Sequence, residues 1–170
     1  MVTKKNTPTK CYITSYENPT LDPFLMANGF GKGIIMFAVP SQGILFRCRV
    51  TGTGINLEFA ALFALLRFLE SSVGDRRPAS IRVFSSNPEF IFSFSGKGRH
   101  LSPGSSREKQ LRKFSELMKI AVGYVELADN YCLTSTADYP SLPDNARPYI
   151  TPERSSKETD FGPFQKGLIF

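Results

Sequence analysis

Residues 33–72 decide the fold of this chain: GIIMFAV (33–39), PSQG (40–43), ILFRCRV (44–50), TGTG (51–54) and INLEFAALFALLRFLESS (55–72). The first and third of these runs are apolar, rich in β-branched and aromatic residues, and separated by a Pro/Gly turn, which predicts an antiparallel hairpin. In the last run, apolar residues recur at helical spacing until little polar surface remains. This pattern predicts a helix that is packed on more than one side.

Further elements lie on both sides of this unit. Residues 10–16, KCYITSY, predict a first strand, and residues 81–86, IRVFSS, predict a fourth strand that ends at Asn87-Pro88. Proline at that position favours the start of a short helix over 89–94. A strand followed by a turn and a helix indicates a crossover to a parallel strand.

A basic helix and a last strand complete the predicted domain. We expect a helix capped by Ser106, without a capping box, whose apolar face consists of Leu111, Phe114, Leu117, Met118 and Ala121. The last strand is predicted over 123–134, with a break at Asp129-Asn130. The element order is therefore three strands, a helix, a strand, helical segments and a fifth strand.

The length of 170 residues, with 41% hydrophobic residues, suits one compact domain plus a tail. We expect a disordered arm over 1–9, a domain over 10–139, and a proline-containing connector with an apolar tail over 140–170. The tail ends FGPFQKGLIF (161–170). It either folds back onto its own domain or docks on a protein partner or a second copy of the chain.

Several classes of protein are disfavoured by composition. The sequence contains no run of about 18 apolar residues, so it predicts no membrane span. The amino-terminal MVTKKNTPTK lacks the apolar core of a secretory signal. We therefore expect a soluble, cytoplasmic protein that does not contact a membrane. Cys11, Cys48 and Cys132 are odd in number and lack C-x-x-C spacing, which argues against a disulfide framework or a zinc site. We interpret them as small buried hydrophobes.

Positive charge is concentrated in one segment of the chain. The formal net charge is +6, and the segment 97–113 carries six cationic residues against Glu108 alone. Such clustering favours a polyanionic partner, although a solvated helix face is the alternative. His100, the single histidine, is interpreted as a solvated loop residue or a phosphate contact. The predicted phosphate contacts are Lys97, Arg99, Arg107, Lys109, Arg112 and Lys113.

The element order over residues 10 to about 138 resembles the ribonuclease H superfamily. The resemblance implies a mixed five-stranded α/β sheet, with three antiparallel strands followed by parallel strands and with flanking helices. The first helix of that family begins with an N-x-x-E-x-x-A pattern, which places a glutamate over the carboxyl ends of the central strands. This chain has Asn56-Leu57-Glu58, so that Glu58 is the matching acidic residue, one position closer to its asparagine.

The other carboxylates of the family pattern are replaced in this chain. Where members have T-D-G in the first strand, this chain has Thr14-Ser15-Tyr16, and where they have S-D or T-D at the end of the fourth strand, it has Ser85-Ser86-Asn87. The departures are therefore Ser15, Ser86 and Asn87. Asp138 matches the family's A-D-x-L-A helix weakly, and a turn residue before proline is its simpler interpretation.

These departures bear on chemistry. The family hydrolyses phosphodiesters with two divalent metals held by several carboxylates, and Mg²⁺ needs oxygen ligands that are usually anionic. With Glu58 and Asp138 as the remaining acidic positions, we predict little or no two-metal activity, no cofactor and no metal site. Glu58 is then either a remaining ligand position or a charge that favours the start of its helix.

Three functions stay open. The preferred hypothesis is a non-catalytic ribonuclease H-like domain that binds RNA, DNA or their hybrid through the basic loop and helix. The second is a protein-interaction or assembly subunit that docks through 161–170. The third is a divergent nuclease dependent on Mg²⁺ or Mn²⁺, with ligands replaced by Glu17, Asp22 or Asp129. Because most of the 15 phenylalanines lie in apolar-periodic runs, they are assigned to the core, and none is assigned to base stacking.

Overall fold

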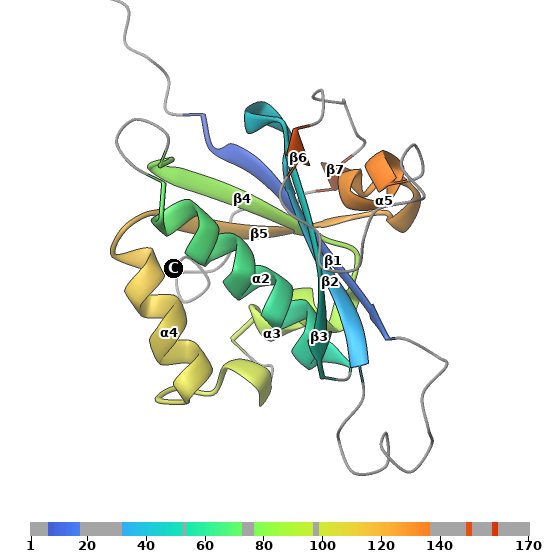
Figure 1. Cartoon of the computed structure of the whole chain (residues 1–170). Coiled ribbons are helices and arrows are strands. Elements are labelled where there is room, and N and C mark those ends of the chain that lie inside the picture. The colour runs from blue at the N-terminus through green and yellow to red at the C-terminus, as the bar shows by residue number, and fades with distance from the viewer. Residues whose placement is uncertain are drawn as a thin grey trace, which may run out of the picture.

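A mixed β-sheet runs through the centre of the protein, with three helices on one face and a short helix on the other (Figure 1). The computed structural model describes residues 7–17, 32–52, 54–72, 77–96, 99–136, 149–150 and 158–159. The strands are β1 (Thr9–Glu17), β2 (Lys32–Val39), β3 (Ile44–Thr51), β4 (Ser80–Ser85), β5 (Lys119–Val125), β6 (Tyr149–Ile150) and β7 (Glu158–Thr159). The α-helices are α2 (Ile55–Glu70), α3 (Pro88–Ser93), α4 (Ser106–Ser115) and α5 (Tyr131–Thr136), and the 3₁₀ turns are η1 (Pro40–Gln42), η3 (Arg99–Leu101) and η4 (Leu127–Asp129).

The sheet confirms the predicted topology. Its order is β6-β3-β2-β1-β4-β5-β7. Strands β1, β2 and β3 are antiparallel neighbours, whereas β4 pairs in parallel with both β1 and β5. The two-residue strands β6 and β7, both from the carboxyl-terminal part of the chain, pair antiparallel with β3 and β5. Each outer edge of the five long strands is thus partly covered, which limits pairing with other chains.

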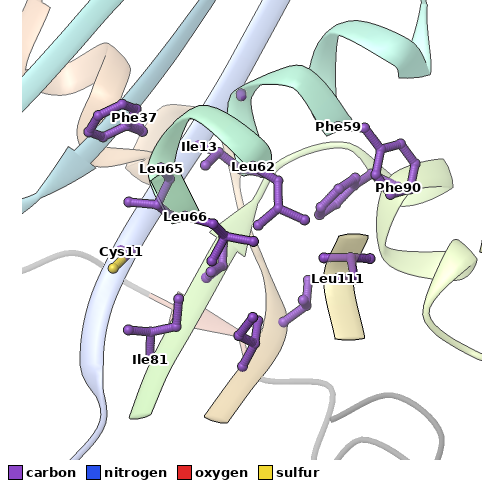
Figure 2. Packing of buried hydrophobic residues seen from close by; sticks show 14 of the residues in the cluster. Cys11, Ile13, Phe37, Phe59, Leu62, Leu65, Leu66, Ile81, Phe90 and Leu111 are labelled. Atoms are coloured by element: carbon purple, nitrogen blue, oxygen red, sulfur yellow. The ribbon is translucent and has the colours of Figure 1, made fainter. Parts of the chain in front are cut away.

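The main core lies between the sheet and helices α2, α3 and α4. Figure 2 shows α2 at its centre, where Leu62, Leu65 and Leu66 pack onto Ile13 and Ile81 of the sheet. Helices α3 and α4 add apolar side chains beside α2, so this helix is covered on more than one side, as predicted. A smaller cluster on the opposite sheet face contains residues of α5 together with side chains of β1, β2, β3, β4 and β5.

The second half of the chain departs from the prediction. The basic helix ends at Ser115 instead of continuing to residue 121, and the last strand is Lys119–Val125 instead of 123–134. Ile120 and Val122 are buried at alternate positions of β5, and Ile81 and Val83 of β4 are their pairing partners. The period of two therefore prevails over the helical period because a neighbouring strand satisfies the backbone. The remainder of the predicted strand forms η4 and α5.

The cap of α4 also differs from the prediction. Ser105, and not Ser106, precedes the helix, and its Oγ accepts a hydrogen bond from the backbone N–H of Glu108 at 3.2 Å. The third helical residue is therefore Glu108, whose carboxylate accepts from the N–H of Gly104 at 3.3 Å. The Ser105-x-x-Glu108 spacing is that of a capping box, although the glutamate reaches Gly104 instead of its own cap residue.

All three cysteines are free thiols. Cys11 and Cys132 are buried, and burial raises the pKa of both thiols, which keeps them neutral. Cys48 is only half-buried, and Cys132 lies in α5 instead of a strand. Within the described ranges, no helix is long and apolar enough to cross a membrane.

A close approach between β2 and α2 fixes the start of α2. A Cβ atom added at Gly33 would overlap the side chain of Leu57 and lie 3.0 Å from the carbonyl oxygen of Tyr16. We expect Gly33→Ala to lower the free energy of unfolding by about 1–3 kcal/mol, as overpacking in cores does. Chemical denaturation measures the loss. In a double-mutant cycle with Leu57→Ala, the two losses should be less than additive, and simple additivity would show that the two residues do not clash.

Candidate functional site

Glu58 occupies the position where the carboxyl ends of two central strands meet the first turn of α2. Its side chain is buried, with 2% exposed. The Oγ of Ser15 donates to Glu58 Oε2 at 2.5 Å, and the Oγ of Ser85 donates to Glu58 Oε1 at 2.6 Å. Each carboxylate oxygen therefore has a hydroxyl donor from a different strand.

Strand geometry explains this convergence. Ser15 and Ser85 continue the alternation of Ile13 and Val83, which point into the core beneath α2. Strands β1 and β4 are parallel, with Tyr12 opposite Phe84, so their carboxyl ends lie at the same edge. Glu58 lies beside these ends, where Ser15 and Ser85 face it.

Ser86 and Asn87, the other predicted departures, lie elsewhere. Because successive strand residues point to opposite faces, Ser85 and not Ser86 contacts Glu58. Asn87 is the N-cap of α3, where its Oδ1 accepts from the N–H groups of Glu89 and Phe90 at 3.0 and 3.1 Å. The alternation Ile81, Val83, Ser85 was visible in the sequence and is the signal that identifies Ser85.

Asn130 is a site residue that the sequence reasoning missed. It is fully buried, and its Nδ2 donates to the carbonyl oxygen of Ile13 at 3.0 Å and to Ser86 Oγ at 3.1 Å. Its Oδ1 accepts from the backbone N–H of Cys132 at 3.0 Å. Asn130 thereby joins the start of α5 to the middle of β1 and to Ser86, just beyond β4. The predicted break at Asp129-Asn130 marked an interruption of the strand but gave no indication of this role.

Burial dominates the electrostatics of Glu58. Desolvation raises the pKa of its carboxyl, and the hydrogen bonds from Ser15 and Ser85 lower that pKa in part. Loss of hydration disfavours the charged form more than two neutral donors favour it. The fold therefore stabilises the neutral acid relative to an exposed glutamate.

The residues of this site do not fit a pair of divalent metals. Both oxygens of Glu58 are occupied by hydroxyl donors, and the pKa of the carboxyl is raised. Glu17 is engaged as well, since its Oε1 accepts from the N–H of Gly54 at the start of α2. In the described parts of the chain, no group of three or more His, Cys, Asp or Glu residues could hold a metal. Asp22 and Asp138 lie outside the described residues.

Arg107 of the basic segment makes contacts within the protein. Its guanidinium carbon lies 4.1 Å from the centroid of the Phe59 ring. Its Nη2 donates to Asn56 Oδ1 at 2.8 Å, and its Nη1 donates to the carbonyl oxygen of His100 at 3.4 Å. Burial lowers the pKa of Arg107. Arg107 thus links the start of α4 to the start of α2.

The other predicted phosphate contacts differ in whether their side chains are already engaged within the protein. Arg112 pairs with the carboxylate of Glu108, which also supports the helix cap. Three residues are exposed and, in the part of the chain that the structure describes, have no side-chain hydrogen bond or ion pair. We name them the exposed cations: Arg99, Lys109 and Lys113. Lys97 lies outside the described residues. His100 Nε2 lies 3.1 Å from Glu89 Oε1, so this ring is not a free loop residue.

The stability of the protein should depend on pH through Glu58. Its folded pKa is raised, so its stabilising contribution is complete below the unfolded value of about 4.3 and is lost as the pH rises through the folded pKa. We expect Glu58→Gln, which cannot ionise, to gain stability relative to the parent protein as the pH is raised from 5 to 8. Thermal unfolding across that range measures the difference.

Two further variants make this prediction specific. Glu58→Ala leaves the buried hydroxyl of Ser85 and the half-buried hydroxyl of Ser15 without their acceptor and creates a cavity, and should cost about 2–4 kcal/mol. Glu116→Gln changes an exposed glutamate and serves as the control. If Glu58→Gln unfolds as readily as Glu58→Ala at pH 8, the interpretation of Glu58 as a disfavoured buried charge is wrong.

Solved structures provide the comparison with known proteins. Ribonuclease H1 from the halophilic archaeon Halobacterium salinarum NRC-1 matches with a TM-score of 0.50 and 13% sequence identity, over 72% of this chain and 88% of that chain. LC11-RNase H1, solved in complex with an RNA/DNA hybrid, matches with a TM-score of 0.49 and 11% identity over the same shares. No protein-family model and no curated protein matches the sequence. With the strand order and the position of α2, the first likeness shows that this protein has a ribonuclease H-like fold.

Proposed function

We propose that this protein is a ribonuclease H-like domain that binds nucleic acid and does not cleave it by two-metal chemistry. The observation that carries the second part is the pair of hydroxyl donors on Glu58. Two-metal hydrolysis needs several carboxylates to hold the ions that activate water and stabilise the leaving oxygen. Here Ser15 and Ser85, two neighbours of Glu58, are neutral and donate hydrogen bonds to its carboxylate, so they add no negative charge that could hold a metal ion.

Replacing this arrangement by a metal site is energetically unfavourable. A cation at Glu58 would have to displace both serine hydroxyls and lose its own hydration to a single carboxylate. Mg²⁺ gives up water reluctantly and prefers anionic oxygen ligands. The Ser15 and Ser85 hydroxyls provide no charge to offset that cost. The site is therefore better suited to a structural hydrogen-bonded acid than to catalysis.

The exposed cations support the binding part of the proposal. Arg99 lies in η3, and Lys109 and Lys113 lie four residues apart on α4, so both lysines project from one side of this helix. Contacts from such groups to phosphates position a nucleic acid without reading its sequence. Arg107 and Arg112 instead support the fold and the helix cap, so we assign them to positioning and not to direct phosphate contact.

Two alternatives are kept as outcomes of the experiments. A divergent nuclease would show cleavage in Mg²⁺ or Mn²⁺. Assembly through 161–170 stays a prediction, because those residues lie outside the described part of the chain. Removal of 161–170 followed by measurement of oligomeric mass tests it independently of nucleic acid.

The proposal predicts binding without cleavage. Labelled single-stranded DNA, duplex DNA, RNA and an RNA–DNA hybrid are titrated with the protein at two salt concentrations, with Mg²⁺ or Mn²⁺ present, and the products are run on a denaturing gel. We expect salt-sensitive binding, because phosphate contacts release counterions, and intact strands. Cleavage that is lost in Glu58→Gln would instead identify a nuclease.

Mutations in the basic segment should distinguish the residues that bind nucleic acid from those that stabilise the fold. We expect Lys109→Glu/Lys113→Glu to reduce affinity by about tenfold or more and to reduce the salt slope by about 2, with unchanged thermal stability. The control Arg67→Glu/Lys119→Glu makes the same change in net charge at two exposed basic residues that lie outside residues 97–113. Equal losses in both variants would indicate a general charge effect and not a binding site.

Arg107→Ala should show the opposite behaviour. Loss of the guanidinium from the Phe59 ring and from Asn56 removes a cation–π contact and a hydrogen bond, which should cost about 1–2 kcal/mol of folding stability. Affinity, measured where the variant is fully folded, should change much less than in the double lysine variant. A large loss of affinity with unchanged unfolding would return Arg107 to the predicted phosphate contacts.

A further inference from the structure

Phe92 differs from the other phenylalanines in the described ranges because it is the exposed one, with 56% of its surface accessible. It lies on α3, the short helix that follows the site strand β4. Its neighbours on that helix, Phe90 and Ile91, are buried, as is Phe94 just beyond the helix. The sequence shows FIFSF at this point and does not distinguish which ring faces solvent.

The exposure of Phe92 is imposed by the packing of α3. The rings of Phe90 and Phe94 lie 4.9 and 6.2 Å from the ring of Phe59 on α2, and their spacing of four residues places them on the same side of the helix. Asn87 caps the start of the helix. A rotation of α3 that buried Phe92 would expose Phe90 and Phe94. An aromatic ring is thus held in solvent by a rigid helix.

The surroundings of Phe92 favour a partner that combines a flat ring with negative charge. Glu89 lies one turn earlier on the same side of α3, and its carboxylate is paired with His100 Nε2 at 3.1 Å. This contact brings η3, with the exposed cation Arg99, beside α3. The pairing reduces the repulsion that Glu89 alone would exert on an anion. An exposed ring on α3 and an exposed guanidinium on the adjoining η3 match a nucleobase followed by its phosphate.

We infer that Phe92 is a stacking platform for a base of single-stranded nucleic acid, with Arg99 contacting the adjoining backbone. The inference rests on the proposed function and narrows its ligand class. A base within a duplex already stacks on its neighbours and cannot present its face to Phe92, whereas an unpaired base can. Stacking of this kind tolerates any base, because every base has a π-face.

The absence of tryptophan from the chain allows a direct test. Phe92→Trp introduces a single tryptophan at the platform, whose fluorescence is titrated with a single-stranded oligonucleotide and with its duplex. We expect the variant to keep the affinity of the parent protein, with fluorescence quenched by the single strand and much less by the duplex. Leu127→Trp, at an equally exposed position (57% for Leu127), should show no such difference.

Affinity measurements complete the test. Phe92→Ala should weaken single-strand binding by about 5- to 100-fold, with little change for duplex, while Leu127→Ala leaves both unchanged. If Phe92→Ala binds a single strand like the parent protein, whereas Lys109→Glu/Lys113→Glu does not, the stacking inference is wrong and the proposed function stands. If the parent protein binds no nucleic acid at all, the stacking inference and the proposed nucleic-acid binding are both wrong.

Discussion

The buried carboxyl of Glu58 holds together the part of the structure on which any function at this site depends. It accepts one hydroxyl from β1 through Ser15 and one from β4 through Ser85, and it belongs to the first turn of α2. Three elements that are distant in the sequence are therefore joined at one acid. Because the pKa of that acid is raised by burial, the junction is stable in the neutral form and becomes less favourable as the carboxyl ionises.

At the carboxyl ends of β1 and β4, a ribonuclease H-like fold carries a buried, hydrogen-bonded acid. The strand order and the helix over the sheet match the predicted architecture, and Glu58 lies beside the carboxyl ends of β1 and β4. Its neighbours Ser15 and Ser85 donate hydrogen bonds to it, and a separate set of hydrogen bonds through Asn130 joins β1, the residue after β4 and α5. The side chains of Glu58 and Asn130 both find their hydrogen-bond partners within the protein, as expected of a structural cluster.

The basic segment shows how charge in a sequence divides between structure and surface. Arg107 is held over Phe59, and Arg112 pairs with the glutamate that supports the start of α4. Arg107 is thus half-buried, and Arg112, although exposed, is already paired with a carboxylate. The same packing that engages Arg107 leaves Phe92 outside the core, so the exposed cations and the exposed ring are consequences of how α2, α3 and α4 fit together.

The sequence by itself determined the first four strands, the hairpin and the long helix 55–70, because hydrophobic periodicity and turn residues act locally. It also identified Glu58. Tertiary structure decided the end of α4 and the extent of β5, since a neighbouring strand had to be present before the period of two could prevail. It likewise decided that Ser85 contacts Glu58, that Asn130 is buried and that Phe92 is exposed, because each depends on which side chains from distant elements fill the same space.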